Sequence, residues 1–179
     1  MKHYDEILQI ASDSHGYFTA AAARNVGVKS CELVRWVKIG RIENPSRGVY
    51  RVANYPPSPM DSYVLAMFTV GKDAVIYGES VLGMLNLIPT NPSWIYVANP
   101  VRVRRKMGDG IKVVIAGVGG WEVHDGVKMQ NVADAIRATR GSVRQDRRMR
   151  AAEEGLRQGF ILDADYRTLM KDMENETAT

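Results

Sequence analysis

The 179-residue sequence predicts an α+β fold with two domains, residues 1–54 and 58–179. Short helical patterns joined by a glycine-containing link fill the start of the chain and lead into a hairpin pattern. A proline cluster, residues 54–59, then interrupts the chain, because proline neither continues a helix nor pairs within a central strand. Beyond it, strand-like runs precede several amphipathic helices, which predicts a small α/β domain with a mixed sheet and C-terminal helices.

The first two helices are short and have clear boundaries. Apolar residues recur at helical spacing from Tyr4 to Ser12, and Asp13-Ser-His-Gly16 ends that pattern. Tyr17-Phe18 then predicts a short extended segment before Thr19, a residue type that caps helices. The run from Ala20 to Asn25 consists mostly of strong helix formers, so we expect a second helix there.

A third helix follows from Ser30, the expected N-cap, to Gly40, the expected stop. Leu33, Trp36 and Val37 form its predicted apolar face, and the single cysteine, Cys31, is expected to be a small packing residue. Two short helices joined by a tight link that contains glycine are typical of a helix-turn-helix, whose second helix enters the major groove of DNA.

Residues 41–52 predict two short strands around the turn Pro45-Ser-Arg-Gly48, a β-wing that completes a winged helix-turn-helix. Arg47 at its tip and Arg51 on the returning strand could reach phosphates or the minor groove. Arg35 is the expected base reader, because arginine binds guanine through two hydrogen bonds. The predicted DNA-binding residues are Lys29, Ser30, Glu32, Arg35, Lys38, Arg41, Arg47 and Arg51. Winged helices that bind protein share this pattern, so both interpretations remain open.

The second domain alternates strand and helix patterns. Strands are expected at 74–77, 94–98, 112–116 and 121–124. Helices are expected from Ser58, across 78–87, and from Asn131, Gln145 and Asp163, with a frayed tail from Glu174.

Net charge is +4 and the sequence pI is near 9.2, which is compatible with a nucleic-acid partner. Residues 137–150 contain six arginines against the single acid Asp146. Such a run is often a solvated helix face, yet it can also neutralise phosphates or an acidic partner. The residues of this candidate patch are Arg140, Arg144, Arg147 and Arg148.

Other chemistry lacks a sequence signature. One cysteine excludes an internal disulfide, and His3, His15 and His124 lie too far apart in sequence for paired metal ligands. The glycines at 117, 119 and 120 are followed by a strand pattern and not by the helix that a dinucleotide site needs. We therefore expect no enzyme activity, cofactor or metal. No secretory signal opens the chain and no apolar run approaches the ~18 residues of a membrane span, so a cytoplasmic protein is expected.

Several N-terminal segments together resemble the winged-helix module of the AbiEi family of bacterial antitoxins. They are Gly16-Tyr-Phe-Thr-Ala20, Val26-Gly-Val28, Ile39-Gly-Arg-Ile42 and Ser46-Arg-Gly-Val-Tyr-Arg51. More diffusely, 74–87, Asp125-Gly-Val127 and the closing helices resemble the family's C-terminal region. The resemblance implies an antitoxin of an abortive-infection toxin–antitoxin pair that represses its own operon, with a nucleotidyltransferase-like toxin as partner.

A helix-turn-helix of this kind would bind inverted repeats in its own promoter as two protomers on double-stranded DNA. A stand-alone transcriptional regulator, or a protein-interaction module without a toxin partner, remains the alternative.

Overall fold

A computed structural model describes residues 2–89, 93–105 and 107–177. It confirms the α+β class: the described residues form eight helices and two sheets. The chain divides into two compact units, the first made of residues up to Ala74 together with Val123–Val127, and the second of the remainder. The predicted domain boundary at residues 54–58 stays a prediction, and the helix that follows the prolines groups with the first unit.

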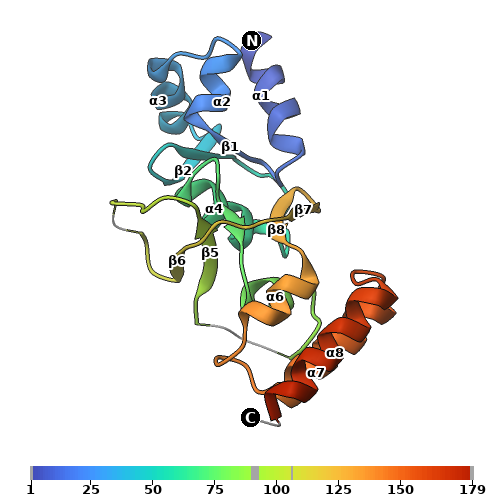
Figure 1. Ribbon diagram of the computed structural model, residues 1–179. Helices are drawn as coiled ribbons and strands as arrows, with labels where there is room; N and C mark the ends of the chain where they lie inside the picture. Colours follow the sequence, from blue (N-terminus) through green and yellow to red (C-terminus); the bar gives the residue numbers. More distant parts are fainter. Residues whose placement is uncertain (1, 90–92, 106, 178–179) are drawn as a thin grey trace. The chain divides into compact units, whose positions relative to one another are not determined.

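The first unit begins with three helices and a small sheet, coloured blue to cyan in Figure 1. Its strands pair antiparallel in the order β1-β3-β2, with Phe18 opposite Tyr50 and Ile42 opposite Val52. The elements are α1 (Lys2–Ser12), β1 (Tyr17–Thr19), α2 (Ala20–Asn25), α3 (Ser30–Lys38), β2 (Ile42–Ser46) and β3 (Val49–Val52).

A shared apolar core holds these short elements together. Helices of six to eleven residues are marginal in isolation, so burial of their apolar faces must supply most of their stability. Thr19 caps α2 as predicted, since its Oγ1 accepts a hydrogen bond from the Ala22 N–H at 3.1 Å. The core comprises Ile7, Ala11, Phe18, Ala23, Val28, Leu33, Trp36, Ile42 and Val52.

Helix α4 (Asp61–Val70) starts later than the sequence pattern predicts. The expected start at Ser58 is wrong because residues 58–61 form a turn, in which the Asp61 N–H donates to the Ser58 carbonyl at 3.1 Å. The Asp61 carboxylate in turn accepts from the Ser58 N–H at 3.2 Å. The proline cluster is therefore tied to the helix that follows it.

The second sheet, most of whose residues belong to the second unit, mixes parallel and antiparallel pairs, as predicted. Its order is β6-β5-β4-β8-β7, with β4 antiparallel to β5 and parallel to β8, and with β5 parallel to β6. The sequence missed β8, which follows a turn where Asp125 and Gly126 both adopt positive φ. The strands are β4 (Val75–Ile76), β5 (Ile95–Asn99), β6 (Ile111–Ile115), β7 (Trp121–His124) and β8 (Val127–Gln130).

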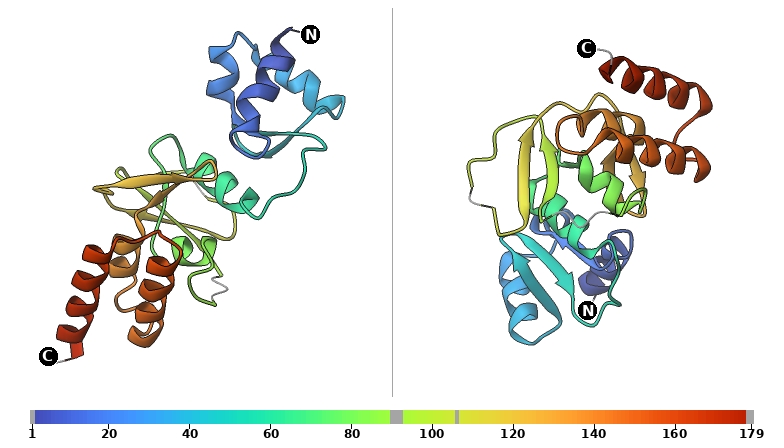
Figure 2. Two further views of the ribbon diagram at one scale, coloured as in Figure 1. Left: turned by 90° about the vertical axis from the view of Figure 1, so that its right-hand side faces the viewer. Right: turned by 90° about the horizontal axis from the view of Figure 1, so that it is seen from below.

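Helices of the second unit follow the predicted pattern with one correction. Asn131 caps α6 by accepting from the Asp134 N–H at 2.8 Å. The C-terminal helices α7 and α8 lie side by side (Figure 2). The expected frayed tail from Glu174 is wrong, because α8 continues to Thr177 and the Glu176 carboxylate is paired with Arg148. The helices are α5 (Glu79–Met84), α6 (Val132–Ala138), α7 (Gln145–Arg157) and α8 (Asp163–Thr177).

Candidate nucleic-acid interface

Helix α3 begins one residue earlier than predicted. Lys29 is the N-cap, in an extended conformation, and the Glu32 carboxylate accepts a hydrogen bond from its backbone N–H at 2.8 Å. Ser30 is the first helical residue, so its predicted capping role is wrong. Glu32 thus completes half of a capping box and complements the positive end of the helix dipole. Its carboxylate is committed to the helix and is a poor candidate for contact with DNA.

The C-terminus of α3 is closed by a Schellman motif. The Gly40 N–H donates to Val37 O at 3.1 Å, and the Arg41 N–H donates to Trp36 O at 2.9 Å. Gly40 adopts φ +72°, a conformation that glycine reaches without the steric cost a side chain brings. The predicted stop is confirmed, and it sets the direction in which Arg41 leaves the helix.

The solvent face of α3 differs from the predicted set of contacts. Successive residues rotate by about 100° around a helix. Because Leu33 and Trp36 are buried, the opposite side presents Cys31, Val34 and Lys38, with Arg35 beside them. All four are exposed, so the expectation that Cys31 packs inside is wrong. Cys31 and Val34 were missed because neither is a typical polar contact residue; the helical wheel opposite the buried tryptophan could have identified them.

Two further apolar side chains on or next to α3 remain in solvent. Val37, predicted to join the apolar face, is 38% exposed, and Ile39 is 55% exposed. Val34 is the most open of the three at 66%. The core needs only a narrow stripe of α3 because the helix is short and packs at its Leu33–Trp36 side. The exposed side of α3 is therefore both apolar and cationic.

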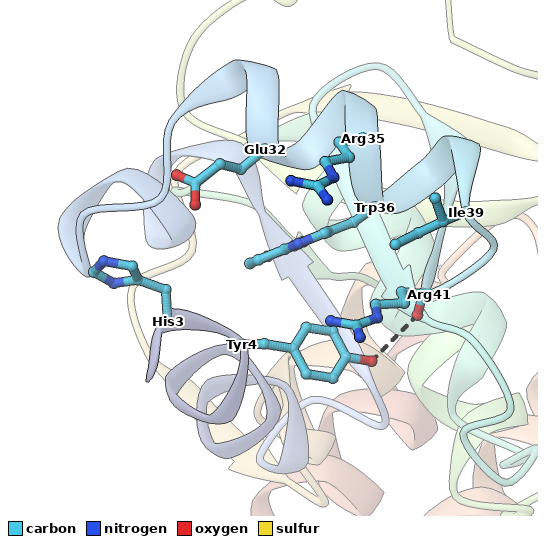
Figure 3. A pocket seen from close by; sticks show the side chains of 7 residues that line it. All are labelled: His3, Tyr4, Glu32, Arg35, Trp36, Ile39 and Arg41. Carbon is cyan, nitrogen blue, oxygen red and sulfur yellow. Dashed lines mark hydrogen bonds between the residues drawn. The ribbon is translucent and has the colours of Figure 1, made fainter. Parts of the chain in front are cut away.

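A pocket of about 330 Å³ opens between the N-terminal turn of α1 and one flank of α3 (Figure 3). Arg35 and Arg41 both point into it, from the helix and from the residue after its C-terminal glycine. Trp36 and Tyr4 form the apolar wall, with their rings edge to face at a centroid distance of 5.3 Å. The lining residues are His3, Tyr4, Glu32, Arg35, Trp36, Ile39 and Arg41.

The electrostatics of this pocket favour an anion. The Arg41 guanidinium lies 5.2 Å from the centroid of the Tyr4 ring, a cation–π contact that leaves its positive charge unneutralised. Among the described residues, neither Arg35 nor Arg41 forms an ion pair with a carboxylate. The pocket's own acid, Glu32, accepts from the Lys29 N–H instead. Two guanidinium groups from different elements therefore converge on one opening.

The wing contributes one exposed arginine. Arg47 stands in the turn between β2 and β3 and is exposed, as are Lys29, Ser30, Arg35, Lys38 and Arg41. The turn is anchored, because the Ala20 N–H donates to Gly48 O at 2.9 Å. The Arg47 side chain therefore extends from a turn whose backbone is held in place by this hydrogen bond.

Arg51 does not fit the expected role in DNA binding. Its side chain is 14% exposed and pairs with Asp61 at 3.1 Å. The same Nη2 donates to the carbonyls of Tyr55 and Pro56, both at 3.2 Å, and the guanidinium lies 5.3 Å from the Tyr17 ring centroid. Arg51 therefore fastens the proline segment and α4 to β3. The burial and the carboxylate partner lie beyond the reach of a local sequence pattern.

The arginines of the predicted patch in the second unit already have partners within that unit. Arg148 is buried, at 4% exposure, and its guanidinium donates to the Glu176 carboxylate, so it cannot belong to a surface patch. Arg140 pairs with the same carboxylate at 3.5 Å, and Arg144 pairs with Asp146 at 3.1 Å. Arg147 donates to the Pro89 carbonyl. These contacts favour the structural interpretation of the run.

Across residues 2–89, 93–105 and 107–177, no cluster of three or more histidine, cysteine or acidic side chains has a geometry that could hold a metal ion. Within the same ranges, every helix is too short or too polar to cross a lipid bilayer.

Residues 5–53 match a protein family described as "Transcriptional regulator, AbiEi antitoxin". The matched range covers α1 to β3, which includes the pocket and the exposed side of α3. The predicted resemblance of the N-terminal module to antitoxin-type transcriptional regulators is therefore confirmed. The match does not extend into residues 54–179. No curated protein matches the chain.

Proposed function

We propose that the first unit binds double-stranded DNA and acts as a transcriptional repressor and antitoxin that autoregulates its operon in an abortive-infection system. The observation that supports this most strongly is the convergence of Arg35 and Arg41 on one pocket beside an exposed, cationic α3. The family match at residues 5–53 supports the regulatory role. Inverted repeats bound by two protomers, and a nucleotidyltransferase-like toxin as partner, belong to the same proposal.

Within this proposal, Arg35 and Arg41 bind a backbone phosphate. Both side chains point into the pocket at the flank of α3. Guanidinium groups bind phosphate oxygens through paired, charge-assisted hydrogen bonds. Phosphate contacts fix the register of a protein on DNA but carry no sequence information. This assignment replaces the base-reading role expected for Arg35.

Base reading then falls to the other exposed side chains of α3. Ser30 and Lys38 can hydrogen-bond to base edges, and the Val34 side chain can contact the methyl group of thymine in the major groove. Lys29, at the N-terminus of α3, and Arg47, in the turn between β2 and β3, add further phosphate contacts. Glu32 and Arg51 are left out, because their charged groups are already engaged within the unit.

The test is a fluorescence anisotropy titration of the full chain against the DNA upstream of its own gene. Arg35→Ala and Arg41→Ala should each weaken binding to every sequence alike. Each should also reduce the slope of log K against log salt by about 0.9, the value for one lost phosphate contact. Lys38→Ala should instead weaken binding to the native DNA sequence more than binding to other sequences, by about 1–3 kcal/mol, and should reduce the base preference at one position.

Arg24→Ala is the matched control, because Arg24 is an exposed arginine of the same unit outside the pocket. It removes one positive charge and should leave the slope unchanged. If Arg35→Ala relaxes a single base position and leaves the slope intact, the phosphate assignment is wrong. Wild-type and control titrations that show no DNA binding at all would refute the repressor function.

A protein-interaction module is the second candidate, favoured by the exposed apolar side chains Val34, Val37 and Ile39. An interface with an apolar core persists at high salt, whereas binding dominated by phosphate neutralisation does not. Pull-down of the adjacent gene product at high salt, lost on Val34→Asp and retained on Arg47→Ala, would favour this candidate.

A further inference from the structure

The loop between β5 and β6 carries a concentration of arginines that the candidate patch in the sequence did not include. Arg102, Arg104 and Arg105 are all exposed, and Val101 beside them is 63% exposed. We name residues 101–105 the arginine arm. Both Figure 1 and Figure 2 show this loop projecting beyond the edge strand β6 of its own sheet.

The start of the arm is held firmly. Asn99, at the end of β5, is 5% exposed, and its side-chain amide donates to the Val101 carbonyl at 2.7 Å. The Asn99 carbonyl accepts from the Ala116 N–H at 3.2 Å, which ties the same point to the end of β6. Residues 102–104 have no regular secondary structure, so the three guanidinium groups extend from an irregular segment with a fixed origin.

The arm differs from most other arginines of the second unit in its electrostatic surroundings. Six arginines elsewhere in that unit form ion pairs with nearby carboxylates: Arg137, Arg140, Arg144, Arg148, Arg157 and Arg167. In the described part of the chain, no carboxylate pairs with Arg102, Arg104 or Arg105. Their positive charges are available to an external anion, whereas most of the arginine-rich run at 137–150 is already neutralised.

We propose that the arginine arm binds the sugar–phosphate backbone of duplex DNA, at phosphates additional to those contacted by the first unit. This inference rests on the proposed DNA binding by that unit. Three arginines within four residues form a charge density typical of DNA interfaces, which are much more positive than protein interfaces. The centres of protein interfaces are instead depleted of charged residues. Arginine also suits phosphate better than lysine, because its planar fork donates two parallel hydrogen bonds.

The experiment measures the salt dependence of operator binding by the full chain. The arm variant Arg102→Ala/Arg104→Ala/Arg105→Ala is compared with the control Arg144→Ala/Arg157→Ala/Arg167→Ala. Both lose three positive charges, but the control arginines are exposed and already paired with carboxylates. The arm variant should lose about 2.7 from the slope of log K against log salt, at about 0.9 per phosphate contact. Between 50 and 200 mM salt, wild-type binding should therefore fall about 40-fold more than binding of the arm variant.

The outcomes separate the arm from the first unit. An arm variant that retains the wild-type slope, while Arg35→Ala/Arg41→Ala reduces it, overturns the inference and leaves the proposed function intact. A reduced slope in the arm variant alone supports the arm and overturns the phosphate pocket. Equal loss of slope in the arm variant and its matched control reduces the effect to net charge and overturns the inference. Binding of poly-glutamate by wild type and arm variant is measured in parallel. If the arm variant keeps the wild-type slope for DNA but no longer binds poly-glutamate, the inference is also overturned, because the arm would then be a site for acidic protein. Far-UV circular dichroism and thermal melting establish that each variant is folded.

Discussion

Removal of the Glu176 carboxylate should destabilise the second unit, because it leaves a buried guanidinium without its partner. The Arg148 side chain is 5% exposed, and both of its terminal nitrogens donate to Glu176. The Arg148 Nε is also buried without a hydrogen-bond partner, so no other described group compensates the charge. Breaking a buried pair from one side costs about 3–5 kcal/mol. Because the Glu176 side chain is 18% exposed, we expect Glu176→Ala to lower the free energy of unfolding by about 3 kcal/mol, the lower end of this range.

The assay is urea unfolding followed by far-UV circular dichroism, with Asp146→Ala as the control. Asp146 pairs with Arg144, but those side chains are 50% and 83% exposed, so its loss should cost at most about 1 kcal/mol. The double variant Arg148→Met/Glu176→Leu removes both charges and should be far more stable than Glu176→Ala. If Glu176→Ala costs no more than Asp146→Ala, the argument from burial is wrong.

Two further predictions concern acid stability and base reading. The hydrogen bonds from Arg148 lower the pKa of Glu176 below its ordinary value near 4.5. The carboxylate's contribution is therefore complete above that value and is lost as pH falls through the lowered pKa of the folded state. The difference in melting temperature between wild type and Glu176→Gln should accordingly be large at pH 7 and shrink steadily below pH ~4; an undiminished difference at low pH would contradict the pairing. If Val34 contacts a thymine methyl, replacing that thymine by deoxyuridine in the operator should weaken wild-type binding about fourfold, at ~0.8 kcal/mol per buried methyl-sized group. Val34→Ala should lose most of this sensitivity in the same anisotropy titration, and a position-by-position uridine scan without effect on wild type would refute the contact.

Local patterns were sufficient for the first unit's order of elements. Thr19 caps α2 and Gly40 ends α3 because both effects depend on residues within one or two helical turns. The prediction that Ser30 is the N-cap of α3 was wrong, although the interaction concerned is equally local. Lys29 has no capping side chain, but it is the N-cap because its backbone N–H donates to the Glu32 carboxylate. This one-residue shift changes where α3 begins but not which face it buries, because Leu33 and Trp36 lie in the core as predicted.

The candidate site was only partly predictable. Arg35, Lys38, Arg41 and Arg47 were identified because cations cluster on the predicted helix and wing. Their grouping depends on how α1 packs against α3, since the pocket is completed by Tyr4, more than thirty positions earlier in the chain. Sequence periodicity describes one helix at a time and does not report which neighbouring element supplies the opposite wall.

The sequence by itself determined the α+β class, the helix-turn-helix spacing and the supply of cations, because short-range periodicity and capping chemistry decide these features. Only the tertiary structure decided which cations are available. Arg51 finds Asp61 ten positions away, and Arg148 finds Glu176 at a separation of 28. Arg102, Arg104 and Arg105 lie close together in the chain, yet their positive charge remains exposed because the fold brings no described carboxylate to them. Charge pairing depends on distance in space, and that distance is set by packing.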